Sequence, residues 1–269
     1  MSKAYQEFLP KLAIILTMNN NEPRLKQVTL LRDSIKNWEE YPFSVPVIQS
    51  LEQIKITNKV CFLVGENGTG KSTLLEAIAS IYGFGKEGGS RNISFSTAEK
   101  DKNDLSEHIR LSWTKKLLGG FFFRAESFFN LASYIDELSK DPIEGGKAYL
   151  SYGGESLHVK SHGQSLLALF KNRFSGGGFY LMDEPEAALS PKRQLSLLVI
   201  INQILKNYPE SQFIIATHSP ILLAYPNAQI ISFNGEQLEE TKYDETEIYQ
   251  ISKNFLNNTS SFIDKLFRE

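Results

Sequence analysis

The second half of the chain alternates between short apolar runs and longer amphipathic segments. Short apolar runs are typical of strands buried on both faces, and amphipathic segments are typical of helices that cover a sheet. The pattern predicts strands at 178–182, 212–217 and 228–233, and helices at 163–173, 191–206, 219–224 and 244–256. A regular alternation of strands and helices predicts an α/β protein with a mostly parallel central sheet.

The first half of the chain is less regular. Apolar and β-branched residues predict strands at 11–17, 26–31, 45–49 and 53–57, which together suggest an N-terminal antiparallel β-layer. A buried strand is predicted at 119–124 and a helix at 126–139, whereas 83–104 and 141–157 are glycine-containing and are predicted to be loops. We expect a single domain over residues 1–269, with a helical and loop insertion at about 83–165.

A phosphate-binding motif lies between an apolar run and a predicted helix. The residues Gly65-Glu66-Asn67-Gly68-Thr69-Gly70-Lys71-Ser72 read G-x-x-x-x-G-K-S, and the run from Gly65 to Thr73 is the expected nucleotide-binding segment. Glycines allow the backbone to turn so that successive amides point inward and bind anions. We expect Lys71 to reach the β- and γ-phosphates and the Ser72 hydroxyl to bind Mg²⁺, so the ligand is a nucleoside triphosphate.

Two carboxylates follow the predicted strand 178–182. Asp183 and Glu184 stand where that strand ends, and the carboxyl ends of parallel strands form the ligand-binding edge of such a sheet. We expect Asp183 to hold Mg²⁺ directly or through water, and Glu184 to orient or deprotonate the attacking water.

The composition excludes several classes of protein. With 269 residues, 41% hydrophobic, the chain can bury a substantial core, and its net charge of −2 provides no general basic field for nucleic acid. The one cysteine, Cys61, stands in an apolar strand and is expected to be a core residue. The absence of a disulfide framework fits a reducing cytosol, so we expect a cytoplasmic protein. No apolar run is long enough to span a membrane.

Three further segments carry a resemblance to a known family. Residues 183–191, Asp-Glu-Pro-Glu-Ala-Ala-Leu-Ser-Pro, resemble the Walker B motif and D-loop of ATP-binding-cassette (ABC) ATPases, in the form found in members outside the transporters. Ser161-His162-Gly163-Gln164 resembles the S-G-G-Q signature, and His218 matches the switch histidine after strand 212–217. With the P-loop, these motifs occur in the family's order, and the resemblance covers roughly residues 55–235.

The resemblance implies an ABC-type ATPase that binds ATP and Mg²⁺. In that family the signature segment closes on the ATP held by a second copy. It therefore implies a head-to-tail homodimer with ATP at the interface, or a hetero-complex with a partner protein. Ser161, Gly163 and Gln164 of one chain would complete the site of the other, formed by the following residues: Lys71, Ser72, Asp183, Glu184 and His218.

The sequence departs from the family in two places. Lys160 and His162 replace the leucine and the first glycine around the signature, which argues against close kinship with transporters. No glutamine of the Q-loop follows strand 119–124, where Arg124-Ala125-Glu126-Ser127 stands instead. Glu126 either supplies a metal-water contact in its place or only caps a helix.

The aromatic residue that would stack on adenine is also open. Tyr41 and Phe43 precede the P-loop, and one of them could contact the base as the family's A-loop aromatic does. Core packing or anchoring of the loop is the favoured interpretation for this pair.

Three functions compete. The first is an ATPase acting on nucleic acid or a partner protein in repair, defence or a toxin system, and the form of the Walker B segment favours it. The second is the ATP-binding subunit of an ABC transporter. The third is a module that holds ATP without hydrolysing it, and Glu184 and His218 argue against that function.

Overall fold

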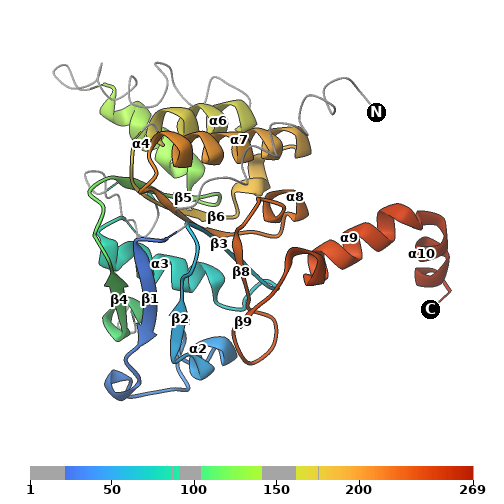
Figure 1. Cartoon of the computed structure of the whole chain (residues 1–269), viewed down its shortest axis with the longest axis horizontal. Helices are drawn as coiled ribbons and strands as arrows, with labels where there is room; N and C mark the ends of the chain where they lie inside the picture. The colour runs from blue at the N-terminus through green and yellow to red at the C-terminus, as the bar shows by residue number, and fades with distance from the viewer. Residues whose placement is uncertain (1–21, 86–87, 91–103, 141–161, 175, 269) are drawn as a thin grey trace.

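The structure is a computed structural model, which describes residues 22–85, 88–90, 104–140, 162–174 and 176–268 (Figure 1). A six-stranded sheet and a three-stranded sheet form its framework. The six-stranded sheet has the order β5-β6-β7-β3-β8-β9, in which only β9 runs antiparallel to its neighbour. Its strands are β3 (Val60–Val64), β5 (Gly120–Arg124), β6 (Phe179–Asp183), β7 (Gln212–Ala216), β8 (Gln229–Ser232) and β9 (Glu239–Glu240).

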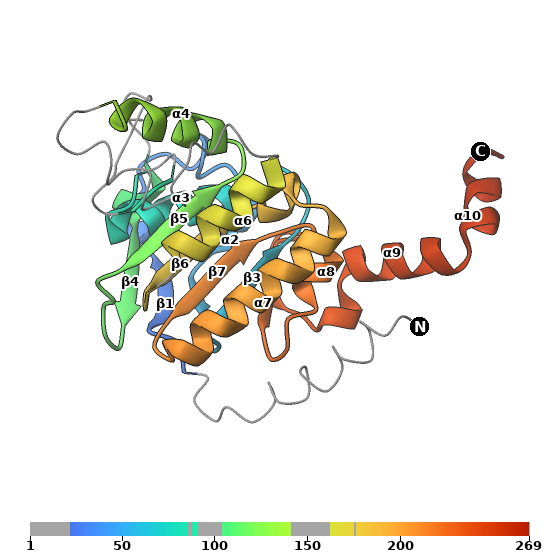
Figure 2. The same cartoon turned by 90° about the horizontal axis from the view of Figure 1, so that it is seen from above.

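Helices cover both faces of this sheet. Every residue of β3, β6 and β7 is buried, because alternate side chains enter two separate cores. Cys61 and Leu63 pack with α3 (Lys71–Tyr82) and the small sheet, whereas Val60, Phe62 and Val64 pack with the helices of the opposite face. Those helices are α4 (Phe128–Leu138), α6 (His162–Arg173), α7 (Pro191–Asn207) and α8 (Pro220–Leu223). Figure 2 shows α6 and α7 covering the strands and running in roughly the same direction as β6 and β7.

The three-stranded sheet is antiparallel and has the order β2-β1-β4. It consists of β1 (Leu25–Leu30), β2 (Gln53–Lys55) and β4 (Ile109–Trp113). The predicted antiparallel layer is therefore confirmed, although β4 comes from the segment after the P-loop and was not expected. Short 3-10 turns complete the elements: η2 (Arg32–Ser34), η3 (Leu105–His108), η4 (Pro185–Ala188) and η5 (Tyr243–Glu245).

One predicted strand is wrong. Residues 45–49 do not form a strand, since α2 (Pro46–Ser50) occupies this segment. Pro46 is the first helical residue, where its fixed φ favours a helix and its missing N–H costs nothing. The strand expected at 11–17, the loop at 141–157 and most of the loop at 83–104 lie outside the described residues. The other strands and helices named above are confirmed, with ends displaced by a few residues.

Two C-terminal helices leave the body of the molecule. Thr246 caps α9 (Glu247–Asn257) by accepting a hydrogen bond from the Tyr249 N–H, and α10 (Thr259–Leu266) follows. Neither helix contains a buried residue. Figures 1 and 2 both show α9 and α10 as an arm that extends away from the sheets.

Candidate nucleotide-binding site

The predicted P-loop lies at the middle of the carboxyl edge of the large sheet. It connects β3, which pairs with β7 and β8, to α3, whose first residue is Lys71. Gly65 has φ +149°, and a Cβ added there would lie 2.9 Å from the Phe233 Cβ. Gly70 has φ +97° at the start of the helix. Only glycine readily adopts a positive φ, and at Gly65 a side chain would also collide with Phe233. The conformation of the loop therefore requires glycine at both positions.

Lys71 is folded over the loop that it closes. Its side-chain Nζ donates to the carbonyl oxygens of Gly65 at 2.7 Å and Glu66 at 2.6 Å. Burial lowers the pKa of Lys71, and the nearby carboxylates of Glu184 and Asp183 oppose that shift. The ammonium group therefore lies within the loop, where it can neutralise the charge of a bound anion.

Ser72 and Asp183 meet across the edge between α3 and β6. The Ser72 hydroxyl donates to Asp183 Oδ1 at 3.0 Å. Burial raises the pKa of Asp183 to about 6, and Arg124 and the Ser72 hydrogen bond act against that rise. A hydroxyl and a carboxylate oxygen are ligands that suit Mg²⁺, which takes few protein ligands and several from water and phosphate. In the part of the chain that the structure describes, no cluster of three or more His, Cys, Asp or Glu could hold a metal. The Ser72 hydroxyl and the Asp183 carboxylate are the kinds of oxygen ligand that Mg²⁺ takes when phosphate supplies others.

Glu184 and His218 come together from neighbouring strands. Asp183 at the end of β6 pairs in register with Ala216 at the end of β7, and the Glu184 N–H donates to the Ala216 carbonyl at 3.0 Å. His218 Nε2 consequently lies 3.6 Å from Glu184 Oε1. Burial lowers the pKa of His218, with a further contribution from Lys71, so the imidazole is neutral at physiological pH.

The structure adds Glu186, a residue that the sequence analysis did not assign to the site. Its Oε1 accepts a hydrogen bond from the His218 backbone N–H at 2.5 Å. Burial raises the pKa of Glu186. The second glutamate of the Asp-Glu-Pro-Glu run thus ties the turn after β6 to the loop after β7, and that repeated acidic residue was the only signal in the sequence.

Arg124 is the second addition, at the end of β5. Its guanidinium contacts Glu76 Oε1 at 2.9 Å and approaches Asp183 Oδ2, to which its Nε lies at 3.7 Å. It also pairs with Glu126, whose side chain is 70% exposed. Glu126 therefore contacts Arg124. Arg124 is the first residue of the segment that stands in place of the family's Q-loop.

The signature segment is described only in part. Ser161 lies outside the described residues, whereas Gly163 and Gln164 stand in the first turn of α6. Gly163 is buried against η4, since a Cβ added there would lie 2.9 Å from the Ala188 carbonyl oxygen. Gln164 is exposed. The start of α6 thus packs beside the turn that follows Glu184.

The two aromatic candidates separate clearly. Phe43 is buried, and its ring packs edge-on against Trp38 and His108. Tyr41 is 65% exposed, and its hydroxyl lies 2.7 Å from Thr73 Oγ1 in the first turn of α3. Phe43 is therefore a core residue, whereas Tyr41 is the aromatic residue that lies beside the P-loop helix α3.

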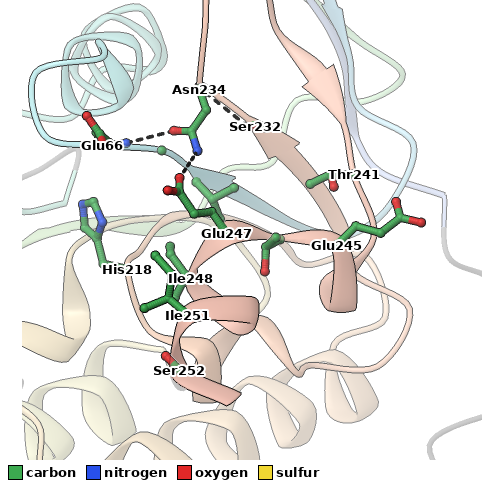
Figure 3. A pocket seen from close by; sticks show the side chains of 13 residues that line it. Glu66, His218, Ser232, Asn234, Thr241, Glu245, Glu247, Ile248, Ile251 and Ser252 are labelled. Atoms are coloured by element: carbon green, nitrogen blue, oxygen red, sulfur yellow. Dashed lines mark hydrogen bonds between the residues drawn. The ribbon is translucent and has the colours of Figure 1, made fainter. Parts of the chain in front are cut away.

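A cavity of about 460 Å³ opens between the P-loop and α9 (Figure 3). Asn234 stands at its rim: its Oδ1 accepts from the Glu66 N–H at 3.1 Å, and its Nδ2 donates to Glu247 at 3.1 Å. Ile248 and Ile251 of α9 line the cavity, and His218 lies on its other side. The first turn of α9 is therefore connected to the P-loop backbone through one amide side chain.

The strand order, the P-loop on the central strand and the carboxylate that ends the neighbouring strand define the class. The chain has the fold of P-loop ATPases of the ABC type. A family model described as "AAA domain, putative AbiEii toxin, Type IV TA system" matches residues 164–224, the stretch that contains Asp183, Glu184 and His218.

Individual relatives agree with that class. The tungstate uptake system ATP-binding protein TupC of Campylobacter jejuni is 29% identical over 213 residues, which are 76% of this chain and 62% of that protein. The ribose import ATP-binding protein RbsA of Bacillus cereus is 24% identical over 194 residues, 65% of this chain and 38% of that protein. This chain thus spans less than two thirds of the length of these relatives.

A solved structure aligns over most of the chain. It is cbiO1 from Clostridium perfringens, part of the ABC transporter complex cbiONQ, with a TM-score of 0.49 and 18% identity over 92% of this chain and 100% of that one. Among the described residues, no helix is both long and apolar enough to cross a membrane.

Proposed function

We propose that this chain binds ATP together with Mg²⁺ and hydrolyses it to ADP and phosphate. The observation that carries the proposal is the 3.0 Å contact of Ser72 with Asp183, at the edge where Lys71 also lies. The amides of the P-loop and the Lys71 ammonium would bind the phosphates. Ser72 and Asp183 would hold Mg²⁺, which supplies charge neutralisation on the phosphate oxygens when bound.

Glu184 is the proposed base for water. Its side chain is 44% exposed, so it can reach a water molecule, and the neutral His218 imidazole lies beside it, with Nε2 3.6 Å from Glu184 Oε1. His218 is neutral and offers one N–H, which suits a contact to a phosphate oxygen. Glu186 would keep this pair aligned through the His218 backbone. Positioning and electrostatics of this kind account for most of the catalysis of phosphoryl transfer.

The signature segment supports a nucleotide-dependent dimer. Gln164 is exposed at the beginning of α6, so a second copy can reach it. We infer that Gly163 and Gln164, together with Ser161, complete the ATP site of the partner in a head-to-tail homodimer. Loss of the γ-phosphate would remove charge-assisted hydrogen bonds of about 1.5–3 kcal/mol each and loosen the dimer.

The cellular role has two candidates. The family description names a putative toxin of a type IV system, which favours an ATPase that acts on nucleic acid or a partner protein in the cytoplasm. The likeness to the tungstate uptake protein favours the alternative, the ATP-binding subunit of a transporter. Binding of DNA or RNA in a gel shift with ATP would favour the first, and co-purification with a membrane protein would favour the second.

The catalytic proposal is tested with Glu184→Gln. This variant should hydrolyse ATP at least about a hundredfold more slowly while retaining ATP binding, because only the base is lost. Light scattering after gel filtration in ATP and Mg²⁺ should show a dimer, and Lys71→Ala should remain a monomer. A Glu184→Gln protein that stays monomeric under these conditions would refute the proposed head-to-tail dimer with ATP at its interface.

A further inference from the structure

Strand register places Arg124 beside the Walker B carboxylate. Arg124 pairs with Asp183 as the last residues of two parallel strands, and the Ala125 N–H donates to the Asp183 carbonyl at 3.1 Å. The Arg124 side chain is only 11% exposed. Its position is therefore fixed by the sheet and by packing rather than by a mobile surface rotamer.

The guanidinium group serves three carboxylates at once. It contacts Glu76 on α3, Glu126 in the segment after β5, and Asp183 at the end of β6. Glu76 follows Ser72 by one helical turn, so Arg124 joins the P-loop helix to the strand that carries Asp183. The two oxygens of Asp183 are divided, with Oδ1 on Ser72 and Oδ2 toward Arg124.

This arrangement has an electrostatic consequence. Without the guanidinium, three carboxylates would stand at the edge where a triphosphate must bind, and like charges at that distance repel strongly in a partly buried site. Arg cannot lose its proton in a protein, so its charge is present at every physiological pH. A glutamine at this position would orient Asp183 but could not offset the carboxylates.

We propose that Arg124 is a positioning residue that replaces the missing Q-loop glutamine and makes nucleotide binding less dependent on the divalent cation. It holds Asp183 Oδ1 on Ser72 and supplies fixed positive charge before a cation arrives. The proposal rests on the proposed function, since it requires the P-loop to bind a nucleoside triphosphate.

The test measures binding of a fluorescent ATP analogue in EDTA and in saturating Mg²⁺, without reference to turnover. Arg124→Gln should weaken the affinity about tenfold in EDTA, because the carboxylates are then uncompensated. In Mg²⁺ the loss should be about twofold at most, since the cation offsets the same charges. Arg124→Lys keeps the charge and should restore most of the affinity in EDTA. Equal weakening of Arg124→Gln in both conditions, or no change in either, would overturn the proposal.

Glu126→Gln is the second variant, and its exposure makes unfolding a small risk. Removing one carboxylate should tighten binding about twofold in EDTA and leave binding in Mg²⁺ unchanged. Weaker binding of Glu126→Gln in EDTA contradicts the electrostatic role of Arg124, even if Arg124→Gln does not fold. A wild-type protein that binds no analogue in either condition refutes the nucleotide site itself, which is a separate outcome.

Discussion

Replacing Glu186 by alanine removes the acceptor of the hydrogen bond that fixes the loop carrying His218. The Glu186 carboxylate is largely buried, and the His218 N–H donates to it at 2.5 Å. Hydrogen bonds to a charged group contribute about 1.5–3 kcal/mol, so Glu186→Ala should lower the free energy of unfolding by about 2 kcal/mol. Glu186→Gln keeps an oxygen in the same place and should lose less than about 1 kcal/mol.

The two variants also differ in their pH dependence. Burial raises the pKa of Glu186 above its ordinary value of 4.5, so the folded protein holds that proton more tightly than the unfolded chain does. The contribution of Glu186 to stability is therefore greatest at low pH and declines as the pH rises through the raised pKa. Because glutamine has no such proton, the stability of Glu186→Gln relative to the wild type should increase as the pH rises above about 4.5.

Urea unfolding at several pH values, without nucleotide or metal, measures both effects. Steady-state ATP hydrolysis should show that Glu186→Ala lowers kcat about tenfold, with KM for ATP nearly unchanged, because His218 is displaced while the P-loop is intact. Equal stability of the Ala and Gln variants, or a Gln-to-wild-type difference that does not vary with pH, would refute this account of Glu186.

Other variants test single features of the site and the fold. Lys71→Ala should abolish ATP binding in calorimetry, and retained affinity would remove the P-loop assignment. Gly120→Ala should lower the free energy of unfolding by more than about 3 kcal/mol, since Gly120 has φ +141° and its Cβ would lie 1.9 Å from the Phe179 carbonyl oxygen. Gly176→Ala is the matched control, because a Cβ at Gly176 meets nothing within 4 Å. Tyr41→Ala should weaken ATP binding with little effect on urea unfolding. The buried Phe43→Ala should show the reverse, with a loss of about 3–5 kcal/mol.

Much of the central sheet could be predicted because its strands are continuous apolar runs. Burial on both faces makes β3, β6 and β7 mostly apolar; the P-loop follows β3 directly, and Asp183 is the last residue of β6. The small sheet was harder to predict. β4 lies far along the chain from β1, with which it pairs, and pairing between distant segments leaves no local signal.

The segment 45–49 shows how a local pattern can mislead. Its apolar residues fit either a strand or a short helix, and periodicity cannot separate the two over so few positions. Pro46 supplied the missing information, because proline favours the first position of a helix. Pro46 therefore favours the start of α2 over a strand at this position.

The contributions of Arg124 and Glu186 could not be predicted, because each depends on how two strands align. Arg124 meets Asp183 only because β5 and β6 end at the same level. Glu186 meets the His218 N–H only because the turn after β6 folds back toward the end of β7. Such contacts depend on how neighbouring strands and turns align in space, and the sequence alone does not give that alignment.

The projecting C-terminal arm offers a site for labelling the protein. Because α10 contributes no buried side chain, a dye or a fused reporter at Lys265 should leave both cores intact. The base of the arm differs, since Glu247 is joined through Asn234 to the first amide after Gly65. A probe at the base of the arm, close to Glu247, would therefore lie one hydrogen-bonded side chain away from the P-loop backbone.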